Sequence, residues 1–499
     1  MLFRHRDSLY DAIAAAAKDG ALPADFSLPR GDQLADGIQW ADGAQDGVAY
    51  YHMRRTKPAD EALRLMKNAV SAASEHAFHE ADRLFTALGK TARAITMADT
   101  LLTYVLEHMK QLTMLNLYAW SRRALLHSSD RECVKYGLCL LVLFKTGQSG
   151  RLKQAIRVIG LSDEFTRFAC LSMRRWPDGN DEIWALAKKV HGWGRIHAVE
   201  LLEPRTEAIR RWFLLDAVHN DIMSAYSALP CWQKSNAADL LKGRPTREEF
   251  TGLRDLLEAL TDEEPVTGLS AIRDREAVVL RFLDTARALP LEAADYVTVR
   301  HLRDWFDESG TGAPVVKACQ ELLSTPDCRA AVTAALQTGE AVDLAEELGI
   351  ECRPALFRLM QTDFETEYYR CKKLIDDPEY HDDVITLFRE RLPLSEMRAA
   401  PTTASLGTGP DFARQNALAY ILHVLKPYPL EGQDLVEAGL QCGPVRTRSA
   451  ALITLQAWAD IKKAPLSGWW PACAALLGRL REAEPDDGVK DRMDQLLAE

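Results

Sequence analysis

Residues 130–145 read DRECVKYGLCLLVLFK, and this stretch determines the fold class that the sequence predicts. Val134, Leu138 and Leu141 recur at intervals of four and three residues, so they share one face of a helix. Ser129 and Glu132 have the spacing of a capping box, which predicts that the helix begins here. A helix with so broad an apolar face must pack against other elements, and the stretch therefore predicts a helical core.

Helix signals recur along the chain, whereas no run of alternating β-branched residues bounded by hairpin turns is present. Short polar breaks separate the helical segments, which predicts antiparallel neighbours packed in pairs. Two further capping boxes and two prolines at expected first helical positions mark helix starts. These signals are Thr246 with Glu249, Thr362 with Glu365, Pro444 and Pro471.

One pattern returns in four segments, at 130–141, 194–202, 413–422 and 445–455. Each segment has a cationic residue near the helix start, then a small residue, then aliphatic residues at helical spacing. This pattern resembles the second helix of HEAT-type repeats, in which the small residue lets paired helices approach closely. The resemblance implies an all-α fold, an α-α superhelix with a loop-rich N-terminal segment. An irregular multi-helical globule is the alternative.

Composition along the chain suggests four parts. Residues 1–60 form a loop-rich N-terminal segment, because 20–60 are rich in Gly, Asp and Pro. Residues 61–398 form a helical-repeat domain, and 399–410 (AAPTTASLGTGP) a linker-like loop. Residues 411–499 form C-terminal helical repeats that end in an acidic cap.

The overall composition excludes several classes of protein. The chain has 499 residues, 47% of them hydrophobic, and a net charge of −11, which argues against bulk binding to nucleic acid or to an anionic membrane. No apolar run reaches the length of a membrane span. Ten cysteines are scattered without a C-x-x-C pair, as expected for reduced thiols that act as small apolar residues. We therefore expect a cytoplasmic protein.

The densest group of chemically versatile side chains lies in 188–203, KKVHGWGRIHAVELLE. An aromatic plate, a cation and two imidazoles flank a Gly-Trp-Gly turn, which suggests a binding rim where two helices meet. In the alternative interpretation the turn is structural: Gly192 and Gly194 take unusual backbone angles, and Trp193 packs between helices. The candidate rim comprises His191, Trp193, Arg195, His197, Glu200, Trp212 and Asp216.

The string VHGWGRIHAVELLEP at 190–204, with DEFTRFACL at 163–171 and WFLLDAVHND at 212–221, resembles a family of bacterial proteins often labelled limonene hydroxylase. This resemblance implies oxidative chemistry on a terpene-like compound. The chain, however, has no recognisable haem, flavin, di-iron, nucleotide or hydrolase motif. We therefore assign no catalytic or metal-binding residue and expect no cofactor.

The leading functional hypothesis is a helical-repeat scaffold whose concave surface binds a protein or peptide. The first alternative is binding of a small apolar molecule, or hydroxylase-like activity as the resemblance implies. The second is a nucleic-acid-binding helical-repeat protein, which would need its Lys and Arg residues gathered on one face despite the acidic balance.

Overall fold

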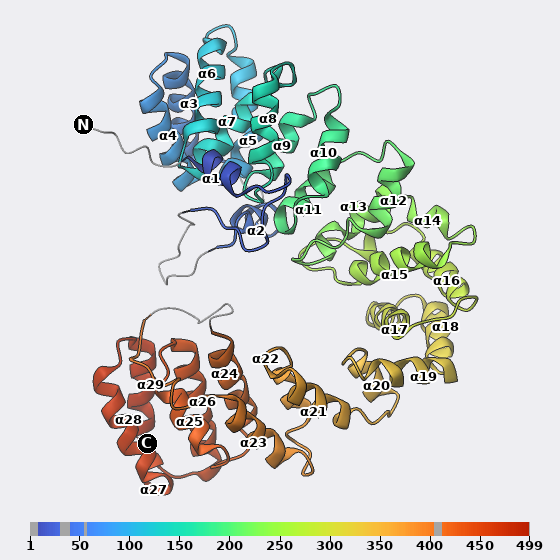
Figure 1. Cartoon of the computed structure of the whole chain (residues 1–499), viewed down its shortest axis with the longest axis vertical. Helices are drawn as coiled ribbons and strands as arrows, with labels where there is room; N and C mark the ends of the chain where they lie inside the picture. Colours follow the sequence, from blue (N-terminus) through green and yellow to red (C-terminus); the bar gives the residue numbers. More distant parts are fainter. Residues whose placement is uncertain (1–7, 30–39, 54–56, 404–411, 499) are drawn as a thin grey trace. The chain divides into compact units, whose positions relative to one another are not determined.

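The computed structural model describes residues 8–29, 40–53, 57–403 and 412–498 (Figure 1). Over these residues the chain forms 29 α-helices, three short 3₁₀ turns and no strand, which confirms the all-α prediction. The chain divides into two compact units, here called unit 1 (residues 1–32, 40–290 and 298–322) and unit 2 (33–39, 291–297 and 323–499). Of the linker-like stretch 399–410, residues 404–410 lie outside the described part, as do 1–7, 30–39 and 54–56 of the N-terminal segment.

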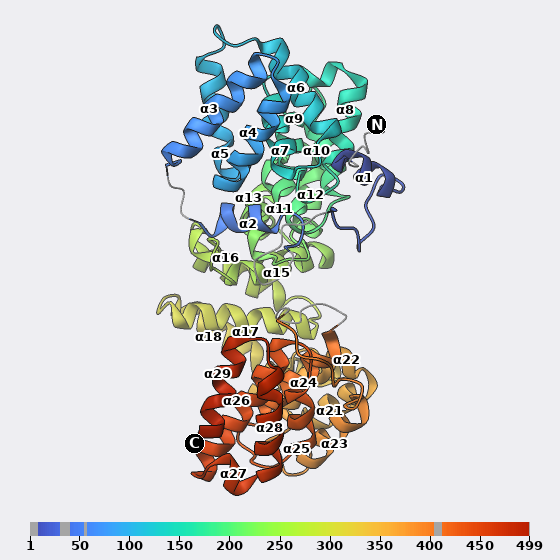
Figure 2. The same cartoon turned by 90° about the vertical axis from the view of Figure 1, so that its left-hand side faces the viewer.

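Unit 1 is built from helices that pack on their neighbours in the sequence, such as α3 on α4, α6 on α7 and α12 on α13 (Figure 2). Two N-terminal helices join this series, α1 against α8 and α6, and α2 against α5. The helices are α1 (Leu9–Ala16), α2 (Ala44–Tyr51), α3 (Asp60–Ser74), α4 (Phe78–Thr91), α5 (Ala94–Glu107), α6 (Met114–His127), α7 (Arg131–Leu141), α8 (Gly150–Ile159), α9 (Thr166–Met173), α10 (Gly179–Ala187), α11 (Gly192–Leu201), α12 (Glu207–Leu215), α13 (Ala225–Ser235), α14 (Ala237–Leu240), α15 (Arg247–Thr261) and α16 (Arg275–Ala286).

Helix α7 is central to unit 1 and contacts α4, α5, α6 and α9. Val134, Leu138 and Leu141 are fully buried, as the apolar periodicity predicts. Gly137 lets α6 approach closely, because a Cβ atom at this position would lie 3.0 Å from the Ala124 Cβ. The core of unit 1 therefore forms around the stretch that the sequence singles out.

The start of α7 differs from the prediction. Asp130 is the N-cap, and its carboxylate accepts a hydrogen bond of 2.8 Å from the Cys133 backbone N–H. Ser129 makes no capping box with Glu132, because the Glu132 side chain is engaged elsewhere and accepts a 2.6 Å hydrogen bond from the Ala94 backbone N–H. The Glu132 carboxylate, which the local spacing predicted to cap this helix, thus forms a longer-range hydrogen bond instead.

The other predicted helix starts have mixed outcomes. The capping box of Thr246 and Glu249 is present at the start of α15. Pro471 occupies the first turn of α28, as predicted, whereas Pro444 is the N-cap of α26 and not its first residue. The Thr362 prediction is wrong, because Thr362 ends α21 and its hydroxyl donates to the Arg358 carbonyl.

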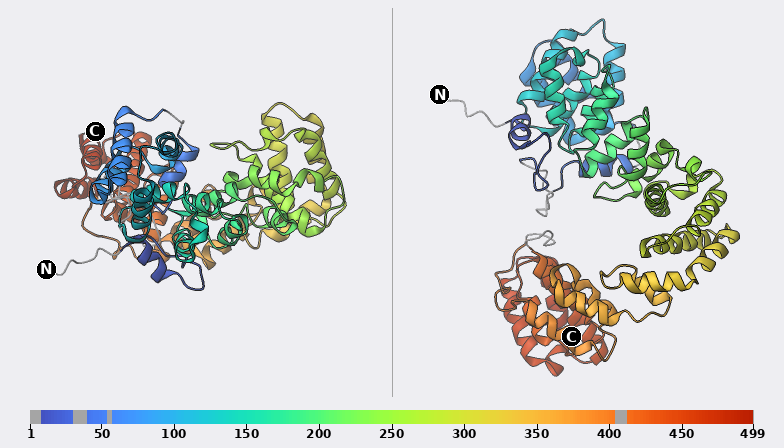
Figure 3. Two further views of the ribbon diagram at one scale, coloured as in Figure 1. Left: turned by 90° about the horizontal axis from the view of Figure 1, so that it is seen from above. Right: turned by 45° about the vertical axis from the view of Figure 1, so that its right-hand side comes forward.

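Unit 2 is also built from helices, which are drawn mainly in yellow to red in Figure 3. Within it, α24, α25 and α26 pack on one another and α28 packs on α29. A buried ion pair between Arg448 and Glu484 links α26 to the end of α28, at 2.7 Å. Helices α17 (Ala293–Glu308) and α18 (Ala313–Leu323) carry residues of both units. The remaining helices are α19 (Pro326–Ala335), α20 (Val342–Glu347), α21 (Arg353–Thr362), α22 (Phe364–Glu367), α23 (His381–Arg391), α24 (Ala413–Val424), α25 (Gln433–Leu440), α26 (Val445–Lys462), α27 (Leu466–Trp469), α28 (Pro471–Ala483) and α29 (Asp487–Ala498).

The four segments with the repeated pattern fall in α7, α11, α24 and α26. Their small residues are buried, as at Ala198, Ala417 and Ala450. The cations differ, since Lys135 is fully buried whereas Arg446 is exposed. The segments therefore share a helix-packing face but not an equivalent charged position, which is compatible with a helical-repeat protein.

The ten cysteines are all free and buried, in agreement with the expectation that they act as small apolar residues. Within the described ranges, no helix combines the length and the apolar character that crossing a membrane requires.

Candidate functional site

The Gly-Trp-Gly turn is the N-terminus of α11, and the side chain of Asp163 caps it. The Asp163 carboxylate accepts hydrogen bonds from the backbone N–H groups of Trp193 and Gly194. Gly192 has a φ of +48°, which favours glycine, and a Cβ atom on Gly194 would lie only 2.5 Å from Asp163 Oδ1. Both glycines therefore make room for the cap. Gly192 has the unusual angle that the structural interpretation predicts, whereas Gly194 does not.

Burial raises the pKa of Asp163 to about 8, against the lowering effect of the two N–H donors. This residue is half-buried and lies next to Glu164 in the loop before α9. A group with such a raised pKa is a candidate for proton transfer, but here its oxygens are already committed to the α11 backbone.

Three of the seven candidate residues lie on the inner face of α11, and the first is Trp193. Its indole is 6% exposed and stacks on the Tyr51 ring, with 6.1 Å between ring centroids. Tyr226 approaches from α13, with its ring centroid 5.0 Å from that of Trp193. Helix α2 covers this group closely, because a Cβ atom on Gly47 would overlap the Trp193 ring. Trp193 thus packs between helices, as the structural interpretation holds.

His197 and Glu200 complete the inner group. Glu200 accepts hydrogen bonds of 2.7 Å from the Tyr50 hydroxyl and from Arg167 Nη1. His197 is 2% exposed, and neither ring nitrogen makes a hydrogen bond to the residues that the structure describes; its Nδ1 lies 4.0 Å from Glu200 Oε2. These contacts join α2, α9 and α11.

Burial lowers the pKa of His197, since the imidazolium form would lose its hydration. Burial by itself would raise the pKa of Glu200, but the neighbouring His197, Arg167 and Tyr50 lower it to about 2. The inner group therefore contains a neutral imidazole and an ionised carboxylate at neutral pH. Both belong to the packing of three helices.

Of the other four candidate residues, His191, Arg195 and Asp216 lie on the outer side, whereas Trp212 is buried. The exposed His191 pairs with Asp221, at 3.0 Å from Nδ1 to Oδ2. Arg195 donates to the Asp216 carbonyl oxygen at 3.0 Å, and its guanidinium lies 5.5 Å from the Trp212 ring centroid. The seven residues therefore do not form one rim: three lie in an aromatic interior, three lie at a polar outer edge, and Trp212 is buried beside Arg195.

A second polar group lies deep in unit 1 and was not identified from the sequence. We call it the ion cluster; it joins the start of α2 to α7 and to the loop before α9. At its centre the fully buried Lys135 ammonium lies 2.8 Å from Asp46 Oδ2 and 2.9 Å from Glu132 Oε1, and it also contacts Glu164. The ion cluster comprises Asp42, Asp46, Arg93, Arg131, Glu132, Lys135 and Glu164.

Two arginines add positive charge to the ion cluster, so that three cations face its four carboxylates. Arg131 Nη1 lies 2.8 Å from Asp42 Oδ1 and 3.1 Å from Glu164 Oε2, and Arg93 pairs with Asp46 at 2.5 Å. Glu164 also accepts a 2.8 Å hydrogen bond from the Gly43 backbone N–H, just before α2. The ion cluster therefore fastens the N-terminal segment to the core.

The carboxylates of Asp46, Glu132 and Glu164 have oxygens within 4.8 Å of one another, a spacing that suits a metal ion. The Lys135 ammonium lies among these oxygens and supplies the positive charge that a metal would bring. Burial opposes ionisation of Glu164, but Lys135 and Arg131 hold its pKa well below the ordinary value. We therefore assign an internal salt-bridge network and not a metal site.

The loop before α9 connects the two groups. Asp163 caps α11, Glu164 joins the ion cluster, and Arg167 binds Glu200 on the inner face of α11. Residues 163–171 are thus in direct contact with residues 190–204, and both strings carry the resemblance to the proteins labelled limonene hydroxylase. In the sequence, a signal for the ion cluster is the lysine at position 135, which stands between Val134 and Tyr136 in the apolar part of 130–145.

Comparisons of the chain with protein-family models, with curated proteins and with solved structures gave no match in any of the three. The resemblance of 190–204 to the proteins labelled limonene hydroxylase accordingly has no support from a family or a homologue.

Proposed function

We propose that this chain is a helical-repeat scaffold that binds a protein or peptide partner on the concave surface of an α-α array. The observation that carries the proposal is that helices adjacent in sequence pack on each other in both units, as α6 does on α7 and α28 on α29. Stacked helix pairs bury one face against the next pair and leave a continuous surface for a partner. Such a function requires no catalytic group.

Exposed apolar side chains at the junction of α5 and α6 support a protein partner. Leu106, Met109 and Leu115 are 54%, 48% and 74% exposed, and they lie within ten positions of one another. Single exposed apolar residues are common, but several close together favour an interaction surface. We include this α5–α6 junction in the proposed binding surface.

Small-angle X-ray scattering tests the array. A compact globule of this length has a radius of gyration of about 23 Å. An α-α superhelix is extended, so we expect a clearly larger value, about 30 Å. A value near 23 Å, with a symmetric pair-distance distribution, would contradict the array.

Partner binding is tested by purifying the tagged chain from the cells that produce it, after mild cross-linking. We expect one enriched protein that is lost from the double variant Met109→Ser/Leu115→Ser. The matched control is Leu497→Ser, which changes an exposed leucine of α29, 40% exposed, and should retain the partner. Equal enrichment with both variants would remove the α5–α6 junction from the proposal, and no enriched protein at all would oppose the scaffold.

The alternatives receive less support. Two of the three cations in the basic and aromatic run 367–373 are paired with acids: Arg370 with Glu367, and Lys373 with Asp343 at 2.9 Å. This pairing does not favour a nucleic-acid surface. The aromatic group around Trp193 is covered by α2, which does not favour a terpene site there.

A further inference from the structure

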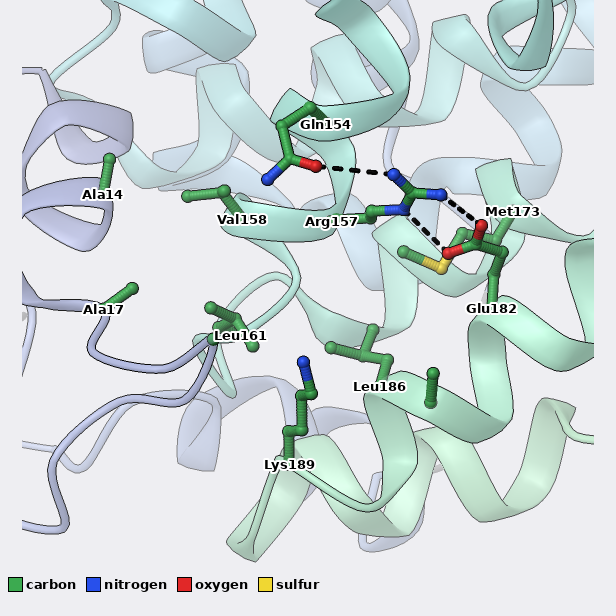
Figure 4. A pocket seen from close by; sticks show the side chains of 12 residues that line it. Ala14, Ala17, Gln154, Arg157, Val158, Leu161, Met173, Glu182, Leu186 and Lys189 are labelled. Carbon is green, nitrogen blue, oxygen red and sulfur yellow. Dashed lines mark hydrogen bonds and ion pairs between the residues drawn. The ribbon is translucent and has the colours of Figure 1, made fainter. Parts of the chain in front are cut away.

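A cavity of about 450 Å³ opens in unit 1 between α1, α8, α9 and α10 (Figure 4). This volume lies in the range of small-molecule sites and has room for about 15 atoms the size of a water molecule. None of the seven candidate residues around α11 lines it. The cavity is thus distinct from both polar groups described above.

The floor of the cavity is apolar. Leu161, Met173 and Leu186 are buried side chains that present carbon and sulfur atoms to it, and Val158 adjoins them (Figure 4). On the opposite side, Ala14 and Ala17 come from α1 and the residue after it. An apolar body of a ligand would be covered on two sides.

The two cations at the rim, Arg157 and Lys189, differ in whether an acidic side chain pairs with them. Arg157 is neutralised by Glu182, with Nε 2.8 Å from the carboxylate. Lys189 has no hydrogen-bond or ion-pair partner among the residues that the structure describes. Figure 4 shows its amine directed toward the space between Leu161 and Leu186. Lys189 is an exposed residue, so a cation without an acidic partner in this part of the chain stands at the rim, above the apolar floor.

Gln154 provides a second polar group at the other end. Its side-chain oxygen accepts from Arg157 Nη1 at 3.4 Å, so the amide nitrogen lies on the side of Val158 and α1 (Figure 4). The sequence of groups across the cavity is thus a cation, an apolar floor and a neutral hydrogen-bond donor. This order matches an elongated molecule with an anionic end.

We propose that this cavity binds a short amphipathic carboxylate, with the carboxylate on the Lys189 ammonium and the hydrocarbon body on Leu161, Met173 and Leu186. The inference is independent of the scaffold function, because it concerns a different surface of unit 1. Since α1 and the turn at Gly20 form one wall, a bound ligand also contacts the N-terminal segment. The ligand thereby stabilises the packing of that segment on α8.

The test uses the full chain and octanoate, which has about ten non-hydrogen atoms, titrated by isothermal calorimetry. For a ligand of this size we expect a Kd of about 1 mM or tighter. Octan-1-ol, which lacks the charge, and acetate, which lacks the apolar body, should each bind at least about fivefold more weakly. Hydrogen exchange should slow at residues 14–20 when octanoate is present.

Variants then locate the site. Lys189→Ala should weaken octanoate binding about tenfold, and Ala185→Phe, at an exposed position lining the cavity, should block it by filling space. Lys188→Ala is the matched control, because that lysine lies over the Trp184 ring at 4.0 Å and does not line the cavity. Unchanged unfolding midpoints without octanoate show that the variants are folded.

Three results would each overturn the proposal. The first is no octanoate binding up to 10 mM, about ten times the expected Kd. The second is equal weakening by Lys189→Ala and Lys188→Ala, and the third is binding of octan-1-ol as tight as that of octanoate. Loss of partner binding in the scaffold experiment has no bearing on these measurements, so the two proposals fail separately.

Discussion

Replacing Lys135 by Met gives the sharpest test of the ion cluster. The Met side chain has a similar length and apolar stem, so the change removes the ammonium with little loss of volume. It leaves the carboxylates of Asp46, Glu132 and Glu164 with oxygens within 4.8 Å of one another, in a site where Asp46 and Glu164 are buried and Glu132 is half-buried. Arg93 and Arg131 remain and compensate part of this negative charge.

The size of the effect follows from burial. Removing one partner of a buried, paired charge costs about 3–5 kcal/mol of the free energy of unfolding, because the other partner keeps its desolvation penalty. We expect a loss in this range, since Lys135 contacts three carboxylates and has no exposed surface. A matched surface change, Lys242→Met, removes a single pair with Asp239 at a lysine that is 64% exposed, and should cost about 0–1 kcal/mol.

Urea unfolding measures the loss, with hydrogen exchange of α7 amides to assign it to unit 1. Adding Glu164→Gln to Lys135→Met should restore at least about 1 kcal/mol if uncompensated charge is the cause. A loss for Lys135→Met no larger than that for Lys242→Met would refute the reasoning, and so would the absence of any recovery in the double variant.

Three further predictions concern α11 and its surroundings. Gly194→Ala should lower the free energy of unfolding by about 1–3 kcal/mol, because the new Cβ would lie 2.5 Å from the Asp163 carboxylate. The control, Gly478→Ala in α28, has open space around the new carbon and should raise the free energy of unfolding by about 0.5–1 kcal/mol. Urea unfolding measures both variants, and similar effects would be evidence against the Asp163 cap. Because the folded pKa of Glu200 is lowered from 4.5 to about 2, its carboxylate stabilises the fold fully above pH 4.5 and loses this effect as the pH falls toward 2. The stability gap between the wild type and Glu200→Gln should therefore be widest at pH 7 and narrower at pH 4; a gap independent of pH would contradict the assignment. Trp193→Ala should lower the free energy of unfolding by about 3–5 kcal/mol, because the indole is buried. His191→Ala, at an exposed position, should lower it by no more than about 0.5 kcal/mol. Thermal or urea unfolding measures both losses, and comparable values would contradict the division into inner and outer groups.

The sequence predicts the helices well where the signal is local. The apolar face of α7, the capping box at Thr246 and Glu249 and the proline start of α28 depend on residues within one or two turns, and all three are present. Local signals fail where a distant group competes for the same atoms. Glu132 illustrates this, because the Ala94 N–H and the Lys135 ammonium take the carboxylate that a capping box would use.

The candidate site shows the same limit. Helical spacing places His197 and Glu200 on one face of α11, and both lie in the inner group. The spacing does not show that α2 covers this face of α11. It also does not show that His191 and Arg195 lie on the outer side of α11. Tyr50 and Glu200 are 150 positions apart, and Gly43 and Glu164 are 121 positions apart.

By itself, the sequence determined an all-α chain with reduced, buried cysteines and a chemically rich string at 190–204. Only the tertiary structure decided that this string divides into two environments, that Lys135 lies among three carboxylates, and that Lys189 stands at the rim of a cavity with an apolar floor. The physical reason is that periodicity fixes which side chains share a helix face, whereas the partner of that face is set by long-range packing. Whether a charged side chain is buried or exposed depends on which element packs against its helix face, and a local sequence pattern does not contain that information.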